Sequence, residues 1–193
     1  MTVKLFVLLC FLSSFNLHGQ TKEEFTIYKW DELSNIPAEK VRAISFKRKK
    51  LKDIPIEILQ YKNLSYLDLS ANKLDSLPPF INKLIHLRNL NLGKNKFKKF
   101  PNSLFTLSSL EVLVLNRNEI SELPESIVHL QKLNYLDLWD NPIAEFPNAF
   151  EQMPKLRELH VEGIKYGPKF QAYWTKVLGQ TKIYFDPPCD CKE

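Results

Sequence analysis

The sequence predicts an α/β solenoid, a stack of similar coils in which each coil combines a short strand with a short helical turn. Three observations predict it. The chain falls into register every 23 residues, and four consecutive segments share the pattern Leu-x-x-Leu-x-Leu-x-x-Asn. A hydrophobic residue followed by proline also recurs in the second half of the first five segments. The segments begin at Val41, Leu64, Leu87, Leu110, Leu133 and Leu156.

The first half of each segment predicts a strand. Leucines at alternate positions, such as Leu67 and Leu69, point to one side of a strand. One coil cannot bury them alone, so stacked coils must share a core. The asparagine that ends the pattern has an amide that both donates and accepts hydrogen bonds. We therefore expect a buried ladder with one asparagine per coil: Asn72, Asn95, Asn118 and Asn141.

The second half of each segment predicts a short helical or 3₁₀ turn. Proline fixes φ and lacks an N–H, which suits a segment without sheet pairing. Apolar residues follow three and six positions later, as Ile81 and Leu84 follow Pro78. This spacing places both side chains on one face, toward the core. The recurring pairs are Ile54-Pro55, Leu77-Pro78, Phe100-Pro101, Leu123-Pro124 and Phe146-Pro147.

These repeats resemble the 23-residue leucine-rich repeats of the plant-intracellular-Ras-group type, whose second half reads Leu-Pro-x-x-Ile-x-x-Leu. The resemblance covers residues 41–164, about five to six coils. It implies a right-handed solenoid with a curved parallel sheet on the concave side and a ligand-binding role. The pattern departs at its ends, where Lys49 and Ile164 replace the asparagine and Val161 replaces the last leucine. Terminal coils of a solenoid are atypical because they cap the core.

Residues 21–40, before the repeats, predict an N-terminal cap. A short helix-like stretch ends at Ile36-Pro37 and carries Tyr28, Trp30, Leu33 and Ile36. This lead-in resembles that of exported bacterial leucine-rich repeat proteins through Trp30, Leu33, Pro37 and Val41, although the alanine of that lead-in is missing.

Residues 165–193 predict a C-terminal cap with a Cys-x-Cys tail. Apolar residues with helical spacing run from Phe170 to Leu178 after Pro168, and residues 183–185 predict a final extended piece. The aromatic stripe fits core packing better than a docking surface. Both caps are expected to cover sheet edges that would otherwise recruit other chains.

Residues 1–20 predict a secretory signal peptide. Lys4 gives a positive start, residues 5–12 form a short apolar run, and a more polar tail ends near Gly19 or Gln20, where cleavage is expected. No segment of the chain is long and apolar enough to span a membrane. A lipoprotein interpretation based on Cys10 is disfavoured because Leu9 is bulky. We therefore expect an exported protein, secreted or periplasmic, without a transmembrane segment.

Charge and cysteine content exclude several classes of function. A net charge of +5 is mild and does not predict nucleic-acid binding. Once the signal peptide is removed, Cys189 and Cys191 remain, separated by one residue. A strained bridge between them, an intermolecular bridge, two free thiols and a weak metal site all fit that spacing. Because no histidine or third cysteine lies nearby in the sequence, we predict neither a metal site nor a cofactor.

The candidate binding surface lies at the strand positions between the leucines. Equivalent residues of parallel strands about 4.8 Å apart form columns on the concave face. Tyr135, Asp137 and Trp139 share one strand there. Exposed aromatic residues and valines with acids at their margin are typical of a protein-binding patch. The candidate contact residues are Tyr66, Asp68, Val112, Val114, Tyr135, Asp137, Trp139 and His160.

Lysines gather in the first three coils. Lys50, Lys73 and Lys96 fall in one column, and further basic residues occupy positions 47–52 and 94–99. Such a rim suits an anionic lipid surface, an acidic glycan or an acidic protein. The simpler interpretation, which we favour at this point, is a solvated face.

The sequence predicts no catalytic arrangement. Asp137 and His160 are neighbours in one column, but Ser45, the serine of that column, lies four coils away, roughly 19 Å. Asp68 and Asp137 lie three coils apart, roughly 14 Å, which is too far for the usual glycosidase pair. The sequence has no phosphate loop and no zinc motif. We expect Asp137 and His160 to be a surface pair.

These observations predict a non-catalytic exported module that holds a protein or peptide on its concave face. The alternative is an envelope-associated structural or adhesive protein that contacts an anionic surface through its basic rim. The repeat resemblance alone would also fit an intracellular partner of a small GTPase, which the signal peptide opposes.

Overall fold

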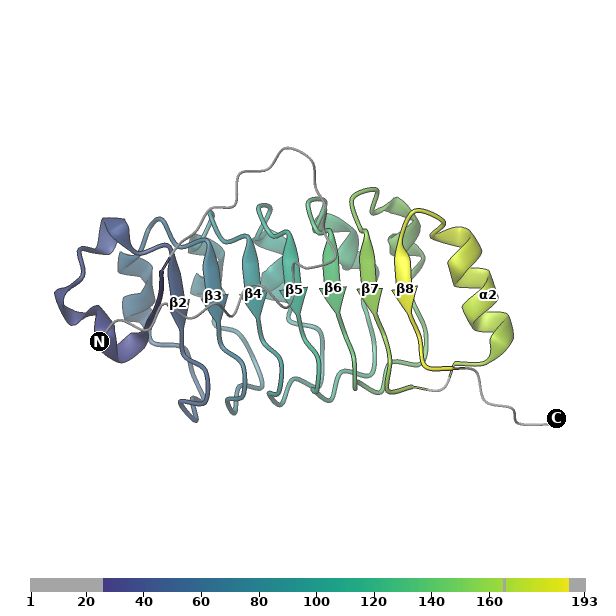
Figure 1. Cartoon of the computed structure of the whole chain (residues 1–193), viewed down its shortest axis with the longest axis horizontal. Coiled ribbons are helices and arrows are strands. Elements are labelled where there is room, and N and C mark those ends of the chain that lie inside the picture. The colour runs from purple at the N-terminus through teal and green to yellow at the C-terminus, as the bar shows by residue number, and fades with distance from the viewer. Residues whose placement is uncertain (1–25, 165, 188–193) are drawn as a thin grey trace.

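The computed structural model describes residues 26–164 and 166–187. The predicted signal peptide, Cys189 and Cys191 lie outside these residues. The described part is one elongated body in which the strands follow one another along the long axis, with the helical turns behind the sheet (Figure 1).

The strands form one parallel sheet in which their order in space equals their order in the chain. Partners in the repeats are 23 residues apart, so that Leu67 pairs with Leu90 and Leu90 pairs with Leu113. This register confirms the predicted solenoid. The strands are β1 (Ile27–Lys29), β2 (Ala43–Ser45), β3 (Tyr66–Asp68), β4 (Asn89–Asn91), β5 (Val112–Val114), β6 (Tyr135–Asp137), β7 (Glu158–His160) and β8 (Lys182–Tyr184).

Five 3₁₀ helices form the second halves of the coils, as the proline spacing predicted. Each begins after its proline; Pro78, for example, has φ −66°, and its carbonyl accepts a 3.1 Å hydrogen bond from the Ile81 N–H. Ile81 is fully buried and Leu84 is almost so. The five are η3 (Ile56–Gln60), η4 (Pro79–Lys83), η5 (Asn102–Thr106), η6 (Glu125–His129) and η7 (Asn148–Gln152).

The asparagine ladder is present and ties each coil to the next. The Asn118 amide donates to the carbonyls of Leu92 at 3.1 Å and Leu115 at 2.8 Å, and its oxygen accepts from the Phe97 N–H at 3.1 Å. Asn72, Asn95 and Asn141 repeat this arrangement. Asn95 is half-buried, whereas the other three are buried as predicted.

The residue before each ladder position turns the chain through the left-handed region. The φ angle is 56° at Ala71 and 57° at Lys94. This conformation costs an L-residue about 1–2 kcal/mol and is usually assigned to glycine. Among the described residues, a glycine takes it at position 163 alone. The other left-handed residues are Arg48, Lys50, Ala71, Lys94, Arg117 and Asp140.

The N-terminal cap covers the open end of the core, as expected, although it is built differently. The helix-like stretch consists of two 3₁₀ helices, η1 (Trp30–Asn35) and η2 (Ala38–Lys40). A strand that the sequence did not predict, β1, precedes them and contains Tyr28, so the expectation that Tyr28 lies on the helical stretch is wrong. Trp30 stacks on Phe46 with ring centroids 4.6 Å apart. The cap therefore extends both the sheet and the core.

The C-terminal cap follows the sequence prediction. Helix α2 (Pro168–Val177) begins after Gly167, and β8 is the predicted extended piece. Trp174 is buried, with its ring centroid 5.3 Å from that of Phe146, whereas Tyr173 is 53% exposed. Core packing therefore explains most of the aromatic stripe. None of the helices within the described residues combines the length and apolarity that crossing a membrane requires.

Candidate ligand-binding surface

The sheet presents its non-leucine side chains on the concave face, because the leucines of the same strands enter the core. Leu113 and Leu136 are fully buried on the core side. Tyr135 and Asp137 flank Leu136 in β6, and therefore point away from that core. Strand geometry thus places all eight candidate residues on one face.

Several candidate residues are less exposed than the sequence predicted. Asp68, Val114 and Asp137 retain only 7%, 7% and 5% of their surface. They share the middle column, where neighbouring side chains about 4.8 Å away cover them. The expectation of exposed acids at the margin and exposed valines is wrong for these three. The remaining candidates are half-buried: Tyr66, Val112, Tyr135, Trp139 and His160.

Asp137 is a structural anchor of this face. One carboxylate oxygen accepts from the Asn116 amide and the other accepts from the Trp139 N–H at 3.0 Å. Burial raises the pKa of the Asp137 carboxyl. The two hydrogen bonds lower that pKa, but burial has the larger effect. The expected surface pair of Asp137 with His160 is wrong, because Asp137 is buried and accepts its hydrogen bonds from Asn116 and from the Trp139 N–H.

His160 belongs instead to a cluster of aromatic rings and glutamates. Its ring stacks on Tyr184 with centroids 4.0 Å apart and lies 5.1 Å from the Tyr135 ring. Its two nitrogens lie 3.4 Å from a Glu158 oxygen and 3.6 Å from a Glu162 oxygen. The other Glu162 oxygen is buried and makes no hydrogen bond among the described residues.

Two cations cover part of the aromatic surface. The Arg117 guanidinium lies 4.2 Å from the centroid of the Trp139 ring and pairs with Asp140 at 3.7 Å. The Lys182 ammonium lies 4.5 Å from the centroid of the Tyr184 ring. Cations at this distance are attracted by the aromatic face. Both rings are therefore held in place from one side.

The structure divides the candidate residues into two groups. Those of β5 to β7 lie together: Val112, Val114, Tyr135, Asp137, Trp139 and His160. Tyr66 and Asp68 stand apart on β3, beyond the polar strand β4 and roughly 14 Å from β6. There Asp68 accepts from the Ser70 N–H at 2.9 Å and from the Ser45 hydroxyl at 3.4 Å.

Sequence reasoning missed three members of the cluster. Glu158 and Glu162 stood in the predicted columns, but repeat spacing alone did not show that both would face His160. Tyr184 comes from the cap, where no repeat predicts a column, and only the pairing of β8 with β7 brings it beside His160. Within the described residues, no group of histidine, cysteine or acidic side chains is arranged to hold a metal ion.

We use the name aromatic–carboxylate cluster for Tyr135, Asp137, Trp139, Glu158, His160, Glu162 and Tyr184. Ring faces in this cluster can supply apolar contact, and its carboxylates can supply hydrogen-bond acceptors.

Comparison with known proteins agrees with this architecture. Two family models match, one described as Leucine rich repeat over residues 85–143 and one as Leucine Rich Repeat over residues 63–84. No curated protein matches the chain.

Many solved structures share the fold, among them the following two. A leucine-rich repeat protein from Leptospira interrogans is 33% identical, with a TM-score of 0.65 over 70% of this chain and 35% of that one. An internalin from Listeria monocytogenes is 18% identical, with a TM-score of 0.58 over 77% of this chain and 44% of that one. The chain thus spans less than half the length of either protein. With its repeats, sheet and turns, the chain belongs to the leucine-rich repeat proteins.

Proposed function

We propose that this protein is a non-catalytic binding module that holds a protein or peptide on its concave face. The observation that carries the proposal is the aromatic–carboxylate cluster on β6 to β8, where half-buried rings lie beside carboxylates. Aromatic residues of this kind dominate the energetics of protein interfaces.

The cluster also indicates the chemistry of the partner. Tyr135 and Trp139 offer apolar ring surface, while Glu158 and Glu162 offer acceptors. The Glu162 side chain is 30% exposed beside His160, and its accessible part can accept a hydrogen bond from a donor on the partner. A partner segment with an apolar side chain next to a cationic or N–H donor group fits best.

The buried candidate residues hold the contact residues in position. Asp137 accepts a hydrogen bond from the Trp139 N–H and another from Asn116, which joins β6 to the segment that follows β5. A surface held in one arrangement before binding loses less conformational entropy on binding. We therefore assign Tyr66, Val112, Tyr135, Trp139 and His160 to contact, and Asp68, Val114 and Asp137 to positioning.

Export is the second part of the proposal. The positive start, short apolar run and polar tail of residues 1–20 support it. Mass spectrometry of the protein from its native cells should find a new N-terminus near residue 20 or 21, in the extracellular or envelope fraction. An intact N-terminus in the cytoplasm would contradict export and favour an intracellular partner.

A matched pair of variants tests the binding face. The protein is immobilised, proteins retained from extracellular and envelope fractions are identified, and the retained partner is purified and titrated. Tyr135→Ala/Trp139→Ala should weaken binding by about thirtyfold or more, since truncating even one aromatic residue that anchors an interface costs about 2 kcal/mol or more.

The control removes exposed apolar surface elsewhere. Ile85 and Tyr173 are 61% and 53% exposed and lie outside the concave face. Ile85→Ala/Tyr173→Ala should therefore bind like the unmodified protein. Equal affinity of both double variants for the partner would refute the concave site.

A further inference from the structure

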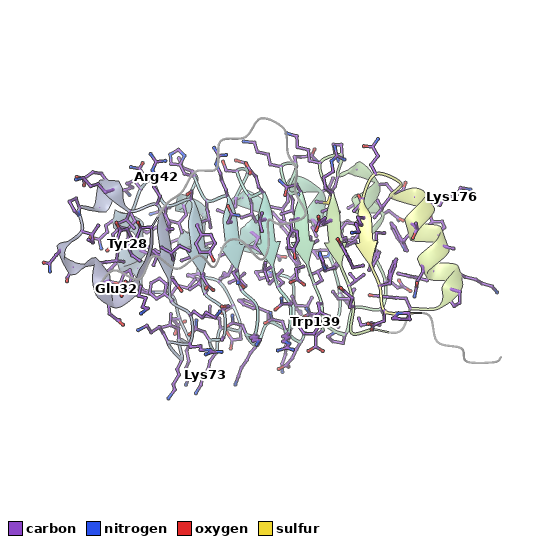
Figure 2. All side chains as sticks on the ribbon, viewed as in Figure 1. Tyr28, Glu32, Arg42, Lys73, Trp139 and Lys176 are labelled. Atoms are coloured by element: carbon purple, nitrogen blue, oxygen red, sulfur yellow. The ribbon has the colours of Figure 1, made fainter. Side chains whose placement is uncertain are left out.

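A second surface of the molecule is strongly basic. The basic rim consists of Lys47, Arg48, Lys49, Lys50, Lys52, Lys73, Lys94, Lys96, Lys98 and Lys99, all exposed at the corners that follow β2, β3 and β4. Figure 2 shows Lys73 extending from this edge of the sheet, away from the strand faces. In the three corner segments 47–53, 70–76 and 93–99, the acids are Asp53 and Asp75.

The rim places basic residues where the backbone is strained. Arg48, Lys50 and Lys94 have φ angles of 60°, 57° and 57°. Glycine or asparagine would take this left-handed conformation more easily. The same conformation recurs at Ala71, Arg117 and Asp140, so it belongs to the corner geometry of the repeats, within which the rim carries basic side chains.

The lysines at the centre of the rim have no ion-pair partners in the part of the chain that the structure describes. Other cations do: Lys49 pairs with Asp31, and Arg88 pairs with Glu111 at 3.3 Å. No such pair forms at Lys73, Lys96, Lys98 or Lys99 within residues 26–164 and 166–187, and their ammonium groups remain available for an external anion.

Three of these lysines line a groove. Lys96, Lys98 and Lys99 surround a hollow of about 580 Å³, with Asp75 and Glu119 at its sides. The corners stack in register, since the Lys96 N–H donates to the Leu74 carbonyl at 2.8 Å. Successive coils therefore add cations along the rim about 4.8 Å apart.

We propose that the basic rim is a second binding site, separate from the concave face, for a linear polyanion of the acidic polysaccharide class. A chain-like ligand can follow the row of corners and enter the groove, whereas a flat bilayer would meet only the outermost tips. The row of lysines ends at the fourth coil, where Glu119 and Glu122 stand at the positions of Lys96 and Lys99. These carboxylates repel an anionic chain and limit the site to the first three coils.

The test uses two variants of equal charge. Lys96→Gln/Lys98→Gln/Lys99→Gln removes the groove cations. Lys132→Gln/Lys155→Gln/Lys169→Gln removes three exposed lysines outside the rim. Binding of the purified protein to a heparin-derived oligosaccharide is measured at low and high salt, beside binding to vesicles of phosphatidylcholine and phosphatidylglycerol. Melting temperatures confirm that both variants fold.

The groove variant should bind the oligosaccharide roughly threefold to a hundredfold more weakly, given the usual range for exposed ion pairs, with a shallower salt dependence. The control variant and Tyr135→Ala/Trp139→Ala should bind like the unmodified protein. Equal weakening in groove and control variants would show an effect of net charge only and overturn the site. So would the absence of oligosaccharide binding at low salt, or binding to the vesicles alone.

Discussion

Removing one ladder asparagine should lower the free energy of unfolding, by an amount set by the number of buried groups left without a hydrogen bond. In Asn118→Ala, the Phe97 N–H loses the acceptor that it has in the structure, at 3.1 Å. The Leu92 and Leu115 carbonyls lose one donor each, but each keeps another, from Asn95 at 2.8 Å and Asn141 at 2.9 Å. One buried N–H is therefore left unpaired, which costs about 1–3 kcal/mol of the free energy of unfolding.

The Leu115 carbonyl is shared by two ladder asparagines, so the effect of replacing both can also be predicted. Leu115 O accepts from both Asn118 and Asn141. In Asn118→Ala/Asn141→Ala it loses both donors, and a buried carbonyl becomes unpaired. The double variant should therefore lose about 1–3 kcal/mol more than the sum of the single variants.

Urea denaturation followed by circular dichroism measures both effects, provided that the transition remains cooperative. Asn82→Ala, at an exposed position of η4, is the control and should change the free energy of unfolding by less than about 0.5 kcal/mol. If Asn118→Ala behaved like the control, or if the double variant were additive, the ladder would not hold the coils together as described.

Three further predictions concern single positions. Ala71→Gly should raise the free energy of unfolding in urea by about 0.5–1 kcal/mol, because relief of left-handed strain exceeds the added entropy of the unfolded chain. Gly93→Ala should lower it by about 1–3 kcal/mol, because the new Cβ would lie 2.5 Å from the Asn116 oxygen and displace an amide that Asp137 anchors; an unchanged value would contradict this packing. Burial raises the pKa of Asp137 above its ordinary 3.8, so the folded state binds its proton more readily. Stability should therefore rise as pH falls through the window just above 3.8, and Asp137→Asn should flatten that slope; an equal slope in both proteins would contradict it.

The fold was predictable from sequence because each coil repeats the same physical solution. Leu67 recurs as a leucine at positions 90, 113 and 136, so the same argument for a strand with an inward leucine applied to four coils. Pro78 and Ile81 likewise defined a turn that recurs. The unrepeated ends offered no such redundancy, and for that reason strand β1 was not predicted.

The candidate binding surface was predictable only in part. Strand alternation placed Tyr135 and Trp139 on the concave face, but it did not show how far neighbouring columns cover each other, so Asp137 was expected at the surface. The stacking of Tyr184 on His160 depends on how the cap docks. That docking follows from tertiary packing of α2 and β8, which no repeat period encodes.

Photo-crosslinking can show whether a partner contacts the concave face. A photo-crosslinkable phenylalanine derivative is placed at Trp139 in one sample and, in another, at Ile56, which lies in η3 behind the sheet and is 59% exposed. After exposure to extracellular and envelope fractions and irradiation, we expect a discrete protein adduct from position 139 and none from position 56. An adduct from position 56 with none from position 139 would contradict the concave site.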